Sequence, residues 1–290
     1  MTQMLLTYQP PYDWQWMKAF LGARALQGIE QQDGDYYQRT LAVIHNGVRL
    51  TGWLRLRPLA DINSVELEIS PSLEPVTDSV AKQVRRLLDL DAQPLLIAEG
   101  VGRLAENAVG LRLPGCINRF EQTVRAILGQ LVSVKMAATL ATRLTEKWGE
   151  PVSTPFAALT HLFPSPAAMA KLTVDDLRGI GVQAKRAACL INIAQAVEEG
   201  RLPLDDITDV QEGVRLLLAM PGIGSWTASY VAMRAWSAPD VFLGGDYLIK
   251  QRFPGMTPGK IARYAEVWKP WRTYATLHLW FNNDWQPDMP

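Results

Sequence analysis

Residues 218–228 read Leu-Ala-Met-Pro-Gly-Ile-Gly-Ser-Trp-Thr-Ala. Apolar residues at helical spacing lead up to this stretch from Val210, so the sequence predicts a helix that ends near Met220, before Pro221. The two glycines that follow permit positive φ and place no Cβ in the way of another molecule. This stretch therefore predicts a helix, a glycine turn and a second helix.

The second helix is expected to run from Trp226 to about Trp236, with Ser225 as its N-cap. Its first N–H groups and the positive end of its dipole would point to where the glycines clear space, which suits a phosphate. A helix-to-helix turn without a ligand is the alternative. The residues expected to bind DNA phosphate are Gly222, Ile223, Gly224, Ser225 and Thr227.

A single carboxylate, Asp246, follows the hairpin after a short apolar run and two glycines. Trp226 and Tyr230 are spaced i, i+4 and share one face of the second helix. Asp246 could also be the N-cap of a helix that begins at Tyr247, and one residue can serve both roles. The closeness of hairpin, aromatic face and carboxylate favours a functional site.

These features resemble the helix-hairpin-helix DNA glycosylases, in which such a hairpin is followed about twenty residues later by a catalytic aspartate. Residues 111–116, 126–133, 246–258 and 268–272 look like the AlkA type of bacterial 3-methyladenine DNA glycosylase II. The resemblance implies an α+β fold, with an N-terminal antiparallel sheet domain (TBP-like) before a two-lobed all-α helix-hairpin-helix fold. The implied domains are 1–94 (sheet), 95–118 plus 239–290 (lobe with the catalytic aspartate) and 119–238 (lobe with the hairpin).

The pattern of the residues also predicts these two styles of structure. Alternating strand-like runs at 36–44, 48–57 and 65–69, with an Asn-Gly turn between the first two, indicate an antiparallel meander. A helix is expected from Trp14 to about Ala25. From about Pro94 the pattern is helical, with caps at Asn118 and Thr257.

The resemblance implies that the protein removes an alkylated base from duplex DNA by flipping it out of the stack. Asp246 would stabilise the oxocarbenium character of the sugar and orient or deprotonate the attacking water. Electron-rich rings favour cationic purines such as 3-methyladenine and 7-methylguanine. The implied base pocket is Trp226, Tyr230, Tyr247 and Trp280, and the implied intercalating residues are Leu131 and Gln130, although Leu131 alone could be a core leucine.

Family members that also cut the strand carry a lysine two residues after the second hairpin glycine, where this chain has Trp226. Without that amine no Schiff base forms at this position, so we expect a monofunctional glycosylase that leaves an abasic site. The alternatives are a glycosylase for another lesion, such as hypoxanthine or an oxidised base, and a non-catalytic DNA-binding protein. Asp246 and the aromatic set favour the enzyme.

Composition bounds the remaining expectations. The chain has 290 residues, 48% of them hydrophobic, and its 29 basic and 29 acidic side chains cancel, so DNA binding would depend on main-chain contacts and local basic clusters. Two cysteines, Cys116 and Cys189, are too few for a four-cysteine iron–sulfur cluster. No signal peptide or membrane span is visible, so a cytoplasmic monomer acting on double-stranded DNA is expected.

The resemblance implies no required cofactor. A Na⁺ or K⁺ ion at the hairpin is implied, held by the main-chain carbonyls of Leu218, Met220 and Ile223.

Two further features stay open. Residues 177–181 repeat the Gly-Ile-Gly of the hairpin without its proline, and could be a second phosphate contact or a plain helix–helix turn. Gly244 and Gly245 stand before Asp246 where members of the family carry a proline, which predicts a more mobile loop.

Overall fold

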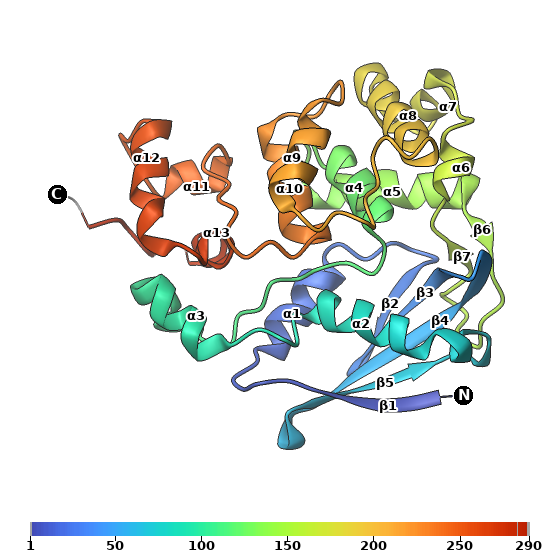
Figure 1. Cartoon of the computed structure of the whole chain (residues 1–290), viewed down its shortest axis with the longest axis horizontal. Coiled ribbons are helices and arrows are strands. Elements are labelled where there is room, and N and C mark those ends of the chain that lie inside the picture. The colour runs from blue at the N-terminus through green and yellow to red at the C-terminus, as the bar shows by residue number, and fades with distance from the viewer. Residues whose placement is uncertain (1, 283, 289–290) are drawn as a thin grey trace.

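The computed structural model describes residues 2–282 and 284–288, in which a sheet domain packs beneath two helical lobes (Figure 1). The sheet is antiparallel, in the order β1-β5-β4-β3-β2. The predicted α+β architecture, an N-terminal antiparallel sheet followed by helical lobes, is confirmed. In the described part of the chain, no helix is long and apolar enough to cross a membrane.

The central strands lie where the alternation predicts them. Asn46 and Gly47 both adopt positive φ, 51° and 75°, and His45 pairs with Val48 across this turn. The edge strands β1 and β2 were not predicted, because neither shows the alternation of apolar and polar residues that marks the other strands. The strands are β1 (Thr2–Thr7), β2 (Glu30–Asp33), β3 (Tyr36–His45), β4 (Val48–Leu59) and β5 (Ser64–Ile69).

Two helices cover the sheet, α1 (Trp14–Gly22) and α2 (Thr77–Leu88). Met17 and Phe20 of α1 join the strand residues in one buried apolar core. The first helix ends three residues before the expected Ala25, and Ala23, Arg24 and Leu26 beyond its end line a pocket described below. Short 3₁₀ segments, Ala60–Ile62 and Pro71–Val76, border the sheet.

The central lobe has a second buried core and carries the hairpin. Asn118 caps its first helix as predicted, since its side chain accepts from the Glu121 N–H at 2.8 Å. Its elements are α4 (Arg119–Leu128), α5 (Val134–Trp148), β6 (Glu150–Pro151), β7 (His161–Leu162), α6 (Pro166–Met169), α7 (Val174–Arg178), α8 (Ala184–Glu198), α9 (Val210–Leu218) and α10 (Ser225–Ala235).

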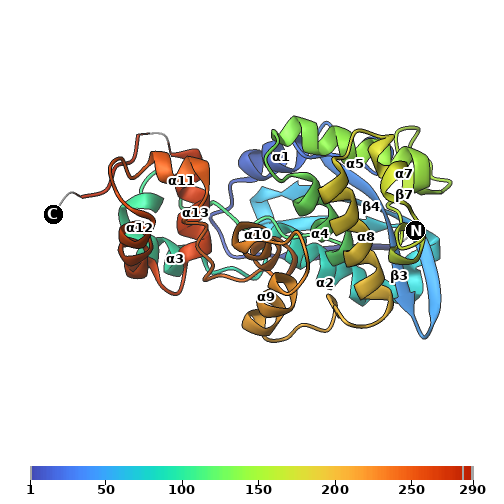
Figure 2. The same cartoon turned by 90° about the horizontal axis from the view of Figure 1, so that it is seen from above.

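The third core joins two distant parts of the sequence. Residues between Ile97 and Leu113 pack against residues between Leu243 and Trp285, and Figure 2 shows their helices gathered at one end of the molecule, beside α10. Thr257 caps α12 as predicted. The elements are α3 (Pro94–Val101), α11 (Tyr247–Gln251), α12 (Pro258–Tyr264), α13 (Arg272–Phe281) and the 3₁₀ segments Gly102–Ala105 and Ala265–Trp268.

His278 of α13 predicts a loss of stability in acid. It is 4% exposed, and burial lowers the pKa of its imidazole to about 4. Between pH 6.5 and 4 the unfolded chain binds a proton that the folded chain does not, so folding loses up to about 3 kcal/mol across this range. Urea unfolding from pH 7 to 4.5 should show a flatter profile of stability against pH for His278→Gln than for wild type. Equal slopes in the two proteins would contradict this assignment.

Candidate active site

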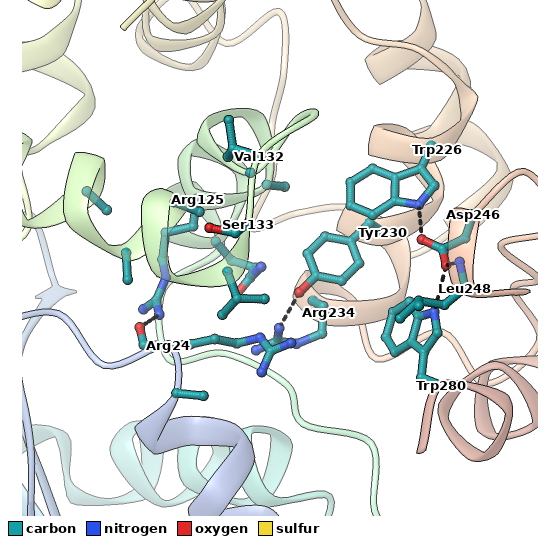
Figure 3. Close-up of a pocket in the computed structure, with 18 of the residues that line it drawn as sticks. Arg24, Arg125, Val132, Ser133, Trp226, Tyr230, Arg234, Asp246, Leu248 and Trp280 are labelled. Atoms are coloured by element: carbon teal, nitrogen blue, oxygen red, sulfur yellow. Dashed lines mark hydrogen bonds between the residues drawn. The ribbon is translucent and has the colours of Figure 1, made fainter. Parts of the chain in front are cut away.

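A pocket of about 690 Å³ opens between the core of the central lobe and the third core, and residues that follow α1 also line it. Asp246 lies at one end of this pocket and Arg24 and Arg125 at the other (Figure 3). The predicted residues Trp226, Tyr230, Tyr247 and Trp280 all line it, although they lie far apart in sequence. This convergence of a carboxylate and aromatic rings in one concave site is typical of a catalytic pocket.

Asp246 is held by N–H donors on both oxygens. Oδ2 accepts from the Trp226 indole N–H at 3.0 Å, and Oδ1 accepts from that of Trp280 at 3.1 Å. Oδ1 also accepts from the main-chain N–H groups of Leu248, at 2.9 Å, and Ile249, at 3.3 Å. Asp246 is therefore both the N-cap of α11 and a carboxylate directed into the pocket.

The two glycines before Asp246 do not leave it without support. The Asp246 N–H donates to the Leu243 carbonyl at 2.8 Å, which closes the turn around them. Neither Gly244 nor Gly245 adopts positive φ. Together with the four bonds to its side chain, this turn holds the Asp246 carboxylate in a defined orientation.

The aromatic residues form a stacked wall beside the carboxylate. The Trp226 and Tyr230 rings stack, with centroids 5.0 Å apart and planes 12° apart, as their i, i+4 spacing predicted. Trp280 lies 6.4 Å from Tyr230, tilted by 52°. Tyr247 is largely exposed, so it borders the mouth of the pocket.

Tyr230 directs its hydroxyl toward Arg234, whose guanidinium donates to it at 2.8 Å (Figure 3). Burial alone would raise the pKa of Tyr230, but the positive charges of Arg234 and Arg24 outweigh it and hold this pKa below its usual value. Both arginines lie on the side of the Tyr230 ring that faces away from Asp246 (Figure 3). The end of the pocket that best accommodates a positive charge is therefore the end beside Asp246.

The hairpin has the predicted shape, with one difference at the cap. Gly224, with φ −96°, is the N-cap of α10 and Ser225 is already helical. No side chain caps this helix, so its first N–H groups are accessible to a phosphate. Ile223 and Thr227 are buried, and the Ile223 N–H donates to the Met220 carbonyl at 3.1 Å, so phosphate contacts by these two residues stay a prediction.

Gly222 is the hairpin glycine that the fold requires, because its φ is +90°. A Cβ there would lie 2.9 Å from the Cys189 Cβ. Gly222→Ala should therefore destabilise the protein by about 2 kcal/mol in urea unfolding. Gly224→Ala meets no atom within 4 Å and should cost less than about 1 kcal/mol. Similar losses for the two variants would contradict this reading of the turn.

Leu131 lies in the loop between α4 and α5 and is fully exposed, at 103% of its reference area. Its φ is +56°, a strained value for a branched residue, and such strain concentrates at functional positions. The alternative that Leu131 is an ordinary core leucine is therefore wrong, because a fully exposed side chain does not pack in a core. Its exposure supports the predicted role as an intercalating wedge.

The wedge loop is tied to the hairpin. The Gln130 side-chain amide donates to the Gly222 carbonyl at 3.1 Å and to the Thr227 hydroxyl at 2.9 Å. Arg186 of α8 donates to the carbonyls of Leu128 and Gln130. Intercalation by Gln130 stays a prediction, and this structure instead shows it as a link between loop and hairpin. Arg186 was not among the predicted site residues, since its contact with Gln130 over 56 residues leaves no local pattern.

No side-chain metal site is present among residues 2–282 and 284–288. Both cysteines are buried and free, and burial raises the pKa of each thiol. The carbonyls predicted to hold a monovalent cation, those of Leu218, Met220 and Ile223, lie at the C-terminal end of α9 and in the turn. The negative end of that helix dipole suits a cation, and the ion itself stays a prediction.

Two protein-family models match this chain. The AlkA N-terminal domain matches residues 3–118, and the family described as HhH-GPD superfamily base excision DNA repair protein matches residues 124–269. The chain belongs to the HhH-GPD superfamily. HhH-GPD proteins act in base excision repair, so the substrate is DNA.

Two curated HhH-GPD relatives match nearly the whole chain. DNA-3-methyladenine glycosylase 2 of Escherichia coli (strain K12) is 47% identical over 98% of each chain. The probable bifunctional transcriptional activator/DNA repair enzyme AlkA of Mycobacterium tuberculosis is 33% identical over 97% of this chain and 58% of its own length. The solved structure of a 3-methyladenine DNA-glycosylase from Archaeoglobus fulgidus has the same fold, with a TM-score of 0.78, 19% identity and coverage of 96% and 97% of the two chains.

Proposed function

We propose that this protein is a monofunctional DNA glycosylase that hydrolyses the N-glycosidic bond of alkylated purines in duplex DNA and leaves an abasic site. The observation that carries this proposal is the Asp246 carboxylate, held by two indole N–H groups at one end of an aromatic pocket. The relative from E. coli, named for 3-methyladenine, supports it.

The chemistry follows from where charge develops. An N-alkylated purine already carries a positive charge, and it becomes neutral as the glycosidic bond breaks, so it needs no general acid. The sugar gains oxocarbenium character, which the Asp246 carboxylate stabilises while it orients the attacking water. The Trp226 and Tyr230 faces favour an electron-poor ring, and each such contact contributes about 1 kcal/mol.

The DNA would be held in three places. The uncapped N-terminus of α10 binds a phosphate next to the lesion, and a Na⁺ or K⁺ ion at the hairpin carbonyls would add a positive charge there. Leu131 fills the gap that the flipped base leaves. The pocket then receives the base. We propose that the protein acts as a monomer in the cytoplasm, on nucleoid DNA.

A panel of defined duplexes tests the substrate class. Duplexes that contain 7-methylguanine, hypoxanthine or 8-oxoguanine are incubated with the protein, and the free base is separated by chromatography. The proposal predicts release of 7-methylguanine faster than of either neutral base. Preferential release of hypoxanthine or 8-oxoguanine would support a glycosylase for those lesions instead, and no release from any duplex would support the non-catalytic alternative.

Strand scission tests the monofunctional assignment. Borohydride reduces a Schiff base between protein and DNA to a stable crosslink, so a lyase is trapped by it. Because Trp226 stands where a lyase carries its lysine, no crosslink should form with borohydride. Strands should be nicked only after hot alkali is added. A borohydride-dependent crosslink would contradict this part of the proposal.

A further inference from the structure

A buried cluster of four charges joins the sheet domain to the central lobe. Glu30 and Arg39 come from β2 and β3, and Glu121 and Arg125 come from α4. Arg39 contacts Glu121 at 2.6 Å and Glu30 at 3.4 Å. Arg125 contacts Glu121 at 2.9 Å and Glu30 at 3.0 Å. Their side chains are between 4% and 17% exposed, so all four are shielded from water.

The cluster is in contact with one wall of the base pocket. Residues 23–26, between α1 and β2, contribute Ala23, Arg24 and Leu26 to that wall. Arg125 donates from Nη2 to the Arg24 carbonyl, and Glu30 accepts from the Leu26 N–H at 3.0 Å. The cluster therefore holds this segment at two main-chain points.

Its charge argues for a geometric role. Two carboxylates and two guanidinium groups give zero net charge, so the cluster as a whole adds little field to the pocket. Buried ion pairs also gain little stability over well-packed apolar residues, because desolvation offsets their attraction. Their hydrogen bonds are directional, however, and specify where the segment lies.

We propose that the sheet domain helps to select the base, because its Glu30, together with Arg125, positions residues 23–26 as the inner wall of the pocket. Glu30 is then a positioning residue for substrate size. Arg125 positions the same segment and also lines the pocket itself, at the end away from Asp246. This inference rests on the proposed function. It gives the sheet domain a role beyond packing.

The experiment compares two conservative variants in one cluster. Arg125→Lys and Arg39→Lys each replace a buried guanidinium with an ammonium, but only Arg125 donates to the wall. Release of ethylated and of methylated purines is measured on alkylated duplex DNA, and the ratio of the two rates reports pocket size. We expect Arg125→Lys to raise the ethyl-to-methyl ratio at least about fivefold and Arg39→Lys to keep it within about twofold of wild type.

Ala23→Val provides a second variant outside the cluster, at an exposed position, should Arg125→Lys fail to fold. Added methyl groups narrow the pocket, so Ala23→Val should lower the same ratio. Two results would overturn this inference and leave the proposed function intact, provided that the wild type is active. One is an unchanged ethyl-to-methyl ratio in Ala23→Val, and the other is an equal change of that ratio in Arg125→Lys and Arg39→Lys. A wild type that releases no alkylated base contradicts the proposed function, and this inference with it.

Discussion

Asp246→Asn is expected to slow the release of alkylated base by at least about a hundredfold while DNA affinity stays near that of wild type. The lost carboxylate charge is the reason, since electrostatic stabilisation in such a site contributes roughly 3 kcal/mol or more. The new amide also directs its N–H groups at the Trp226 indole N–H, where Oδ2 now accepts. Single-turnover base release and equilibrium binding to methylated duplex measure the two effects separately.

Asp209→Asn is the matched control for this variant. Asp209 is also an aspartate N-cap, accepting from the Gln211 N–H at 2.9 Å at the start of α9, but it lies outside the pocket. Asparagine caps a helix about as well as aspartate, so both variants should fold. If Asp246→Asn releases base at the rate of Asp209→Asn, the carboxylate has no catalytic role.

Leu131→Ala is expected to slow base release from duplex DNA by about 10- to 30-fold. Inserting the leucine buries an apolar side chain worth about 1.5–2 kcal/mol, which offsets part of the cost of unstacking the flipped nucleotide. Single-stranded methylated DNA needs no wedge, so its rate should change less than about twofold. Folding stability should also be unchanged, because Leu131 is fully exposed.

Ile44→Ala is the control for Leu131→Ala. Ile44 is 76% exposed at the end of β3, in the sheet domain and away from the pocket, so its truncation removes similar apolar area without touching the wedge loop. Its rates on both DNA forms should match wild type. Equal slowing on single and double strands by Leu131→Ala would show that the leucine does not act as a wedge.

Local patterns predicted the parts of the site that depend on few residues. Pro221 and the glycines marked the hairpin, the Asn-Gly turn placed β3 against β4, and the spacing of Trp226 and Tyr230 placed both rings on one face. The choice of Trp280 came from the family resemblance, because a contact with Asp246 across 34 residues has no local signature.

What the sequence did not reveal is mostly long-range. Charge pairs such as Arg39 with Glu121 and Arg125 with Glu30 span 82 and 95 residues, and each residue alone reads as a solvated side chain. Nothing in the local pattern marked the early end of α1 or the positive φ of Leu131. The sequence therefore identified the chemistry of the site better than the parts that position it.

The central claim, hydrolysis of alkylated purines without strand cleavage, is tested most directly on one sample of methylated duplex DNA. Free bases are quantified by chromatography and abasic sites are counted with an aldehyde-reactive probe on the same DNA. We predict free 3-methyladenine and 7-methylguanine, matched one for one by abasic sites in unbroken strands. Intact methylated bases after prolonged incubation, or broken strands in place of abasic sites, would contradict the account.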